Sequence, residues 1–97
     1  MATTHLPKVY KKVDNSAGTA PVEEILISKP AYIKKILLTN HGTSNVIVTL
    51  RDGTNDFMDL ILPTDETVKL GDFDVINDLR IVVPAGAVVS VTVIYSI

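Results

Sequence analysis

The chain has 97 residues, a formal net charge of −2 and no cysteine, and 46% of its residues are hydrophobic although only three are tyrosine and two phenylalanine. This length suits one domain, and the many Val, Ile and Leu residues favour β-structure. Acids and bases are scattered, so we expect no nucleic-acid or membrane binding by charge, and the lack of cysteine excludes disulfides and thiolate zinc sites.

The N-terminal part, residues 1–21, is predicted to be an arm and linker. Residues 5–13 form either an edge strand, because Pro7 cannot donate a ladder hydrogen bond, or a separate arm. Residues 14–21 are rich in small residues and form a loop. The start lacks the apolar core of a signal peptide, and no apolar stretch is long enough to span a membrane, so we expect a soluble protein made in a cytoplasm.

The β-sandwich domain is predicted to be residues 22–97, organised around residues 31–53. An apolar run, a polar turn at 39–45 and an alternating run at 46–51 predict a hairpin. The pattern changes parity at Lys34 and Lys35, which indicates either a β-bulge or a strand that is covered on both sides. A buried face on two long strands requires a second sheet to cover it.

Further short strands are predicted at residues 22–28, 57–62, 66–70, 75–83 and 87–97. An Asp-Gly dipeptide at Asp52 and Gly53 predicts a tight turn between antiparallel strands. On the last strand, Val88 and Ile94 lie on the face opposite the main apolar one, which indicates a covering partner or arm. Together these patterns predict an all-β protein, a small antiparallel β-sandwich or jelly roll of about seven to eight strands.

No catalytic or metal-binding constellation is found in the sequence. The two histidines are distant, and the acidic residues at 52–59 do not have calcium-loop spacing. No serine has the context of a nucleophile. We therefore predict no enzyme activity, no metal and no cofactor. A stacking platform for a sugar stays an alternative, with few aromatic residues to form it, namely Tyr10, Tyr32 and Phe57.

Residues 32–97 resemble small virion proteins of tailed bacteriophages, through four strand motifs and the segment that links two of them. The matching residues are Ile36, Leu38 and Asn40; Val46, Val48 and Leu50; Leu62, Pro63, Glu66 and Leu70; and Val89, Val91, Val93 and Tyr95. The resemblance implies a head decoration (cement) protein on the capsid surface of a virion, or a neck or tail accessory protein. It also implies binding to the major capsid protein, commonly as a homotrimer.

In that role, we expect contacts with the particle or with neighbouring subunits from the arm and from the outward apolar residues of the last strand. The candidates are Leu6, Val9, Tyr10, Val88 and Ile94. Deletion of residues 1–20 is expected to abolish particle binding and leave the sandwich folded. The competing hypothesis is a carbohydrate- or receptor-binding module that uses loop residues, namely Asn40, His41, Asn45, Asp52, Asn55 and Asp56.

Overall fold

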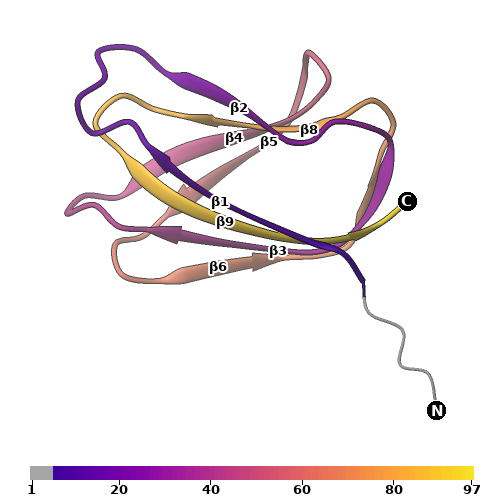
Figure 1. Ribbon diagram of the computed structural model, residues 1–97. Helices are drawn as coiled ribbons and strands as arrows, with labels where there is room; N and C mark the ends of the chain where they lie inside the picture. The colour runs from indigo at the N-terminus through magenta and orange to yellow at the C-terminus, as the bar shows by residue number, and fades with distance from the viewer. Residues whose placement is uncertain (1–5) are drawn as a thin grey trace.

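The computed structural model describes residues 6–97, which form nine strands in two packed antiparallel sheets (Figure 1). The strands are β1 (Lys8–Asp14), β2 (Val22–Ile27), β3 (Ala31–Asn40), β4 (Val46–Asp52), β5 (Asn55–Leu62), β6 (Thr67–Leu70), β7 (Phe73–Val75), β8 (Leu79–Val83) and β9 (Val88–Ser96). Within residues 6–97 no helix is long and apolar enough to cross a membrane. The predicted all-β sandwich is confirmed, while His5, the predicted start of the first strand, lies outside the described residues.

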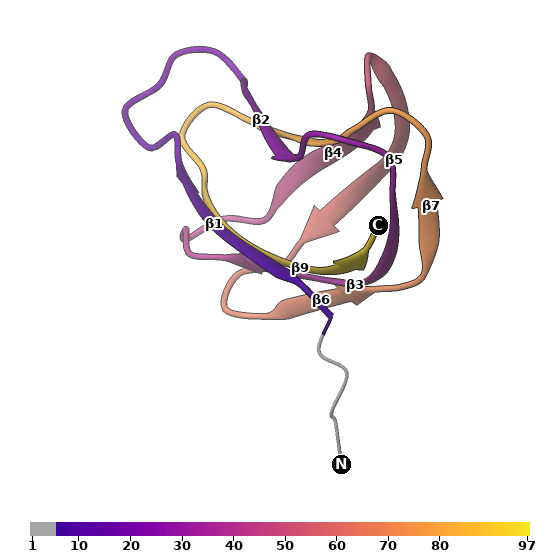
Figure 2. The same cartoon turned by 45° about the vertical axis from the view of Figure 1, so that its right-hand side comes forward.

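The strand order is that of a jelly roll. One sheet has the order β1-β9-β3-β6, with the short β7 also paired to β3, and the other has the order β2-β8-β4-β5. The pairs β1–β9, β2–β8, β3–β6 and β4–β5 are nested around the turn between β4 and β5, as in a long hairpin rolled into two layers. Figures 1 and 2 show these layers from two directions.

The predicted hairpin of residues 31–53 is wrong. Strand β3 belongs to the five-stranded sheet and β4 to the four-stranded sheet, so the polar turn between them crosses from one layer to the other. Each strand has a buried apolar face, but the two faces oppose one another across the core. An alternating pattern shows which side of a strand is buried, and it does not show which strand is its neighbour.

The predicted Asp-Gly turn is confirmed between β4 and β5. Asp52 pairs with Asn55, which leaves Gly53 and Thr54 as a two-residue turn. Gly53 has a φ of 62°, a left-handed backbone conformation that residues other than glycine rarely adopt. This turn is therefore the tip around which the rolled hairpin is closed.

The parity change in β3 is a β-bulge, as one of the two alternatives predicted. The pairing of β3 with β9 shifts between Ile33 and Lys35, and Ile33, Ile36 and Leu38 are all buried. In contrast, the single strand predicted at residues 75–83 is wrong. Residues 76–78 form a bend between β7 of one sheet and β8 of the other. Both flanking strands still present apolar residues to the shared core, which explains the regular pattern.

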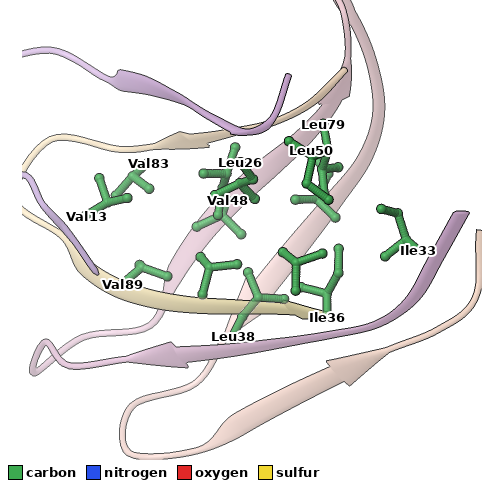
Figure 3. Packing of buried hydrophobic residues seen from close by; sticks show 14 of the residues in the cluster. Val13, Leu26, Ile33, Ile36, Leu38, Val48, Leu50, Leu79, Val83 and Val89 are labelled. Carbon is green, nitrogen blue, oxygen red and sulfur yellow. The ribbon is translucent and has the colours of Figure 1, made fainter. Parts of the chain in front are cut away.

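The core lies between the two sheets and consists of aliphatic side chains (Figure 3). Val89, Ile36 and Leu38 point inward from the five-stranded sheet, and Leu50, Leu79 and Val83 point inward from the other. The arrangement follows from the period of two along each strand. The other side of each sheet is left facing outward.

Two buried asparagines hold the loops at one end of the sandwich. The Asn40 side chain is fully buried, donates to the Ser44 and Leu62 carbonyl oxygens at 2.8 and 3.0 Å, and accepts from the Gly42 N–H. The Asn15 amide donates to the carbonyl oxygens of Ala20, Val83 and Pro84. Buried polar groups need such partners, so these residues connect loops of the two layers.

The segment assigned to an arm contributes a strand to the sandwich. Strand β1 pairs with β9 of its own chain over seven residues and forms one edge of the five-stranded sheet. Val13 is buried in the core, and Asn15 follows it. Of the two alternatives for residues 5–13, the edge strand describes Lys8–Asp14.

Candidate functional site

The outward side of the five-stranded sheet carries most of the candidate contact residues. We call this surface the basic face and define it by the outward residues of four strands. They are Lys8, Tyr10 and Lys12 on β1; Val88, Ser90, Thr92 and Ile94 on β9; Lys35, Leu37 and Thr39 on β3; and Thr67 and Lys69 on β6. These residues alternate with residues that face the core.

Strand register places the residues of the basic face in three central rows. The rows are Lys8, Ile94 and Lys35; Tyr10, Thr92, Leu37 and Lys69; and Lys12, Ser90, Thr39 and Thr67. Neighbours across strands lie close enough for their side chains to touch. Apolar and hydroxyl side chains therefore occupy the centre, and lysines lie around them.

Tyr10 and His41 are positioned by a single buried hydroxyl group. Ser90 is 8% exposed, and its Oγ lies 3.1 Å from Tyr10 Oη and 2.6 Å from His41 Nε2. Tyr10 itself is 65% exposed, so an aromatic ring is presented at the surface and tethered at its hydroxyl end. In residues 6–97 no carboxylate hydrogen-bonds to His41, and the Ser90–His41 pair gives no reason to assign a catalytic activity.

The lysines of the basic face have no acidic partners within the described chain. The ion pairs formed in residues 6–97 involve Lys11, Arg51 and Arg80. Lys8, Lys12, Lys35 and Lys69 take part in none of them. No ion pair within residues 6–97 therefore engages these four lysines, although, besides the hydrogen bonds from Ser16, the charge of Lys12 helps to lower the pKa of Asp14.

The acidic residues Asp14 and Asp72, at the two ends of the basic face, accept hydrogen bonds from neighbouring residues. Hydrogen bonds from the Ser16 hydroxyl and N–H, at 2.6 and 3.0 Å, lower the pKa of Asp14. At the other end Tyr32 donates to Asp72, which raises the pKa of Tyr32 and lowers that of Asp72. Asp74 lies opposite Tyr32 in the register. The lysine-rich rows lie between these acidic ends.

The outward side of the four-stranded sheet, which we call the arginine face, is organised differently. It is formed by Glu23, Ile25, Ile47, Thr49, Arg51, Asp59, Ile61, Arg80 and Val82. Arg80 Nε and Nη2 lie 2.8 and 3.0 Å from the carboxylate of Asp78, and the pair raises the pKa of Arg80 and lowers that of Asp78. Both arginines also contact Glu23, and Arg51 Nε lies 2.6 Å from Asp56.

The predicted contact residues are divided by the fold. Tyr10, Val88 and Ile94 lie on the basic face, as residues of adjacent strands β1 and β9. Val9 is on the opposite side of β1 and packs against the core. Leu6 precedes β1 and is half-buried. The structure therefore brings three of the five together on one surface.

The residues of the competing carbohydrate hypothesis do not form one site. His41 and Asn45 lie beyond one end of β4, and Asp52, Asn55 and Asp56 lie at the other end, about 20 Å away for a seven-residue strand. Asn40 is fully buried with its amide engaged, and the Asp52 carboxylate accepts from the N–H groups of Ile76 and Asn77. Of the aromatic residues, Tyr10 and Tyr32 lie on strands of the five-stranded sheet, whereas Phe57 lies on β5 of the other sheet and packs against Phe73 with ring centroids 5.4 Å apart.

An open depression of about 510 Å³ lies at the end of the sandwich, between residues 44–47 and 84–86. Its lining includes Ser44, Asn45 and Ile47 and contains no charged side chain. Within residues 6–97 no group of three or more His, Cys, Asp or Glu residues is arranged to hold a metal ion. Of the two outer faces, the arginine face exposes Ile25, Ile47 and Ile61, and the basic face combines the exposed Tyr10 with lysines that form no ion pair within residues 6–97.

Nine of the twelve residues that define this surface were not predicted as contacts, among them Lys35, Leu37, Lys69 and Ser90. Alternation along each strand places their side chains on the side opposite the core, so their outward direction follows from the sequence. Their grouping requires knowing that β9 lies between β1 and β3 and that β6 lies next to β3. That order is not contained in any local pattern.

Comparison with known proteins leaves the chain unassigned to a family. No protein-family model matches the sequence, and a search of curated proteins finds no match. The fold alone does not select a function, because jelly rolls serve in capsids, lectins and cupins. The outer surfaces of the sandwich are therefore the features from which a function can be proposed.

Proposed function

We propose that this protein is a non-catalytic virion structural protein that binds the major capsid protein on the outer surface of a head and stabilises the shell. The proposal extends the resemblance between residues 32–97 and small virion proteins of tailed bacteriophages. The observation that carries it is the basic face. Apolar side chains and unpaired lysines lie together there on a surface that no other element of residues 6–97 covers.

A decoration protein binds its particle more tightly when several identical copies bind together. Each copy needs only a moderate contact with the shell, because a trimer that engages several capsid subunits multiplies the effective affinity. We therefore propose a homotrimer as the binding unit. Light scattering of the purified protein is expected to give three times the monomer mass, and a monomer that remains monomeric on the particle would exclude the trimer.

The role of residues 1–20 has to be tested by point substitutions and not by deletion. Removing them takes away strand β1, the buried Val13 and the Asn15 contacts with the loop at Val83 and Pro84. We therefore expect this deletion to destabilise the sandwich, in contrast to the expectation from the sequence that the sandwich stays folded. Loss of particle binding by the truncated chain would reflect loss of the fold.

The decisive experiment compares virions assembled with and without the gene for this protein. We expect the chain to be present in purified virions in many copies and to sediment with gene-deleted particles when it is added back. Decorated particles should also resist heat or chelator better than undecorated ones. Absence from virions together with no add-back binding would contradict the proposal, and binding on a glycan array would favour the carbohydrate hypothesis.

A further inference from the structure

The basic face has the anatomy of a protein-binding surface. Ile94 and Leu37 lie on its inner strands β9 and β3, the tethered ring of Tyr10 lies on the edge strand β1, and lysines flank these three residues in the register. Protein interfaces commonly have an apolar core with aromatic residues and a polar rim that excludes water. Here the charged members of the face are all lysines, while Asp14 and Asp72 lie at its two ends.

Edge protection does not account for all of these lysines. Lysines on exposed edge strands discourage pairing with other chains, which is a sufficient reason for Lys8 and Lys12 on β1 and for Lys69 on β6. Lys35 is on β3, an inner strand that pairs with β9 at this position. Its charge therefore has no role in blocking an edge.

The arginine face shows that this chain can neutralise its own surface cations. Glu23, Asp56 and Asp78 lie within 3.4 Å of the two arginines. No acid of residues 6–97 is placed in the same way beside the four lysines of the basic face. These four lysines are therefore free to pair with carboxylates of a partner.

We propose that the basic face is the docking surface for the particle, and that its target is a protein surface on which Asp and Glu residues surround an apolar patch. This inference rests on the proposed function and names the surface and the chemistry of the partner. A nucleic-acid backbone would match the lysines but would leave Ile94 and Leu37 without an apolar counterpart. A protein surface satisfies both features.

Tyr10 is the anchor of this interface. A tyrosine brings a large contact area with few rotatable bonds, and its hydrogen bond to Ser90 restricts the ring before the partner arrives. Tyr10→Ala should therefore weaken binding more than Tyr10→Phe. Ser90→Ala should have an intermediate effect, because it releases both Tyr10 and His41.

The test uses matched charge reversals and gene-deleted particles treated with nuclease. Lys35→Glu and Lys69→Glu change the basic face, and Lys29→Glu makes the same charge change in the exposed turn between β2 and β3. Circular dichroism confirms that each variant is folded. Binding is titrated by co-sedimentation at several salt concentrations.

Each reversal on the basic face is expected to weaken binding about tenfold or more, whereas Lys29→Glu is expected to bind like the unmodified protein. Added salt should weaken the unmodified protein, because screening acts over about 8 Å at physiological ionic strength.

Four results would overturn the inference. If the unmodified protein does not bind particles at all, the proposed function fails and the docking surface fails with it. If the unmodified protein binds and both face variants bind equally well, the proposed function stands and the basic face is not the docking surface. If soluble duplex DNA competes for the face, the partner is a nucleic acid. In the same way, if Lys69→Glu only converts an oligomer into monomers, the partner is a second copy of this chain.

Discussion

The two outer faces of the sandwich are built from the same kind of strand and differ in how their charges are satisfied. On the arginine face, Arg51 and Arg80 are held by Glu23, Asp56 and Asp78. On the basic face, the lysines have no such partners within residues 6–97. The first arrangement contributes to the fold itself, while the second leaves charge available for a partner. The two surfaces therefore differ in whether their cations form ion pairs within the fold, and not in whether they carry positive charge.

The largest expected effect concerns the core that both faces share. Ile81 on β8 is fully buried, while Ile47 on β4 is 58% exposed on the arginine face. Ile81→Ala should lower the free energy of unfolding by about 2–5 kcal/mol, because it leaves a cavity between the sheets. Ile47→Ala should cost at most about 1 kcal/mol, through lost strand propensity. Urea denaturation measures both, and equal costs would contradict this account of the core.

A second prediction concerns the crossing between the layers, which keeps the two faces in separate sheets. Asn40→Asp replaces a buried amide donor by a carboxylate facing the carbonyl oxygens of Ser44 and Leu62. We expect a loss of about 1–3 kcal/mol in the free energy of unfolding. The control is Asn45→Asp, which keeps the oxygen that accepts from the Thr64 N–H and should change stability by less than about 0.5 kcal/mol.

The pH dependence of stability should separate the two faces. The hydrogen bond from Arg80 lowers the pKa of Asp78 below its ordinary value of 3.8, so the pair stabilises the fold above that pH. This stabilisation is lost as the pH falls through the lowered pKa of the folded state. Asp78→Asn should therefore reduce Tm near neutral pH, and the difference from the unmodified protein should shrink in acid. A constant difference at all pH values would refute the assignment.

The smallest expected effect is on the thermal stability of the protein when lysines of the basic face are replaced. Lys35→Gln and Lys69→Gln remove charges that have no ion-pair partner in the described chain, so Tm should stay unchanged or rise slightly as like-charge repulsion falls. Arg80→Gln, measured in parallel, should lower Tm. A marked loss of stability in the lysine variants would mean that the basic face has a structural role after all.

Local prediction succeeded where structure depends on neighbours in the sequence. The turn at Asp52 and Gly53 was predicted because glycine accepts positive φ, and the bulge near Lys35 was one of two alternatives that the change of apolar parity there indicated. The outward position of Val88 and Ile94 followed from alternation along the last strand. Tyr10 and Val9 were both expected to make contacts as parts of an arm, and of the two only Tyr10 lies on the outward side, because Val9 packs against the core.

Prediction failed where the chain passes between the layers. The crossings at residues 41–45 and 76–78 connect strands that share an apolar parity. The first was interpreted as the turn of a hairpin, and the second as part of a single strand. Buried Asn15 and Asn40 hold such connections, but an asparagine in a polar loop does not differ in sequence from an exposed one. Their role depends on which carbonyl groups the fold brings within hydrogen-bond distance.

The sequence by itself determined the all-β class, the side of most strands that is buried and the tight turn at Gly53, since these depend on side-chain period and on local backbone conformation. Only the tertiary structure decided that β9 lies between β1 and β3, and so that Tyr10, Ile94 and Lys35 share one face. Strand order is set by packing two whole sheets against one core. It brings together residues from distant parts of the chain, which no local pattern specifies.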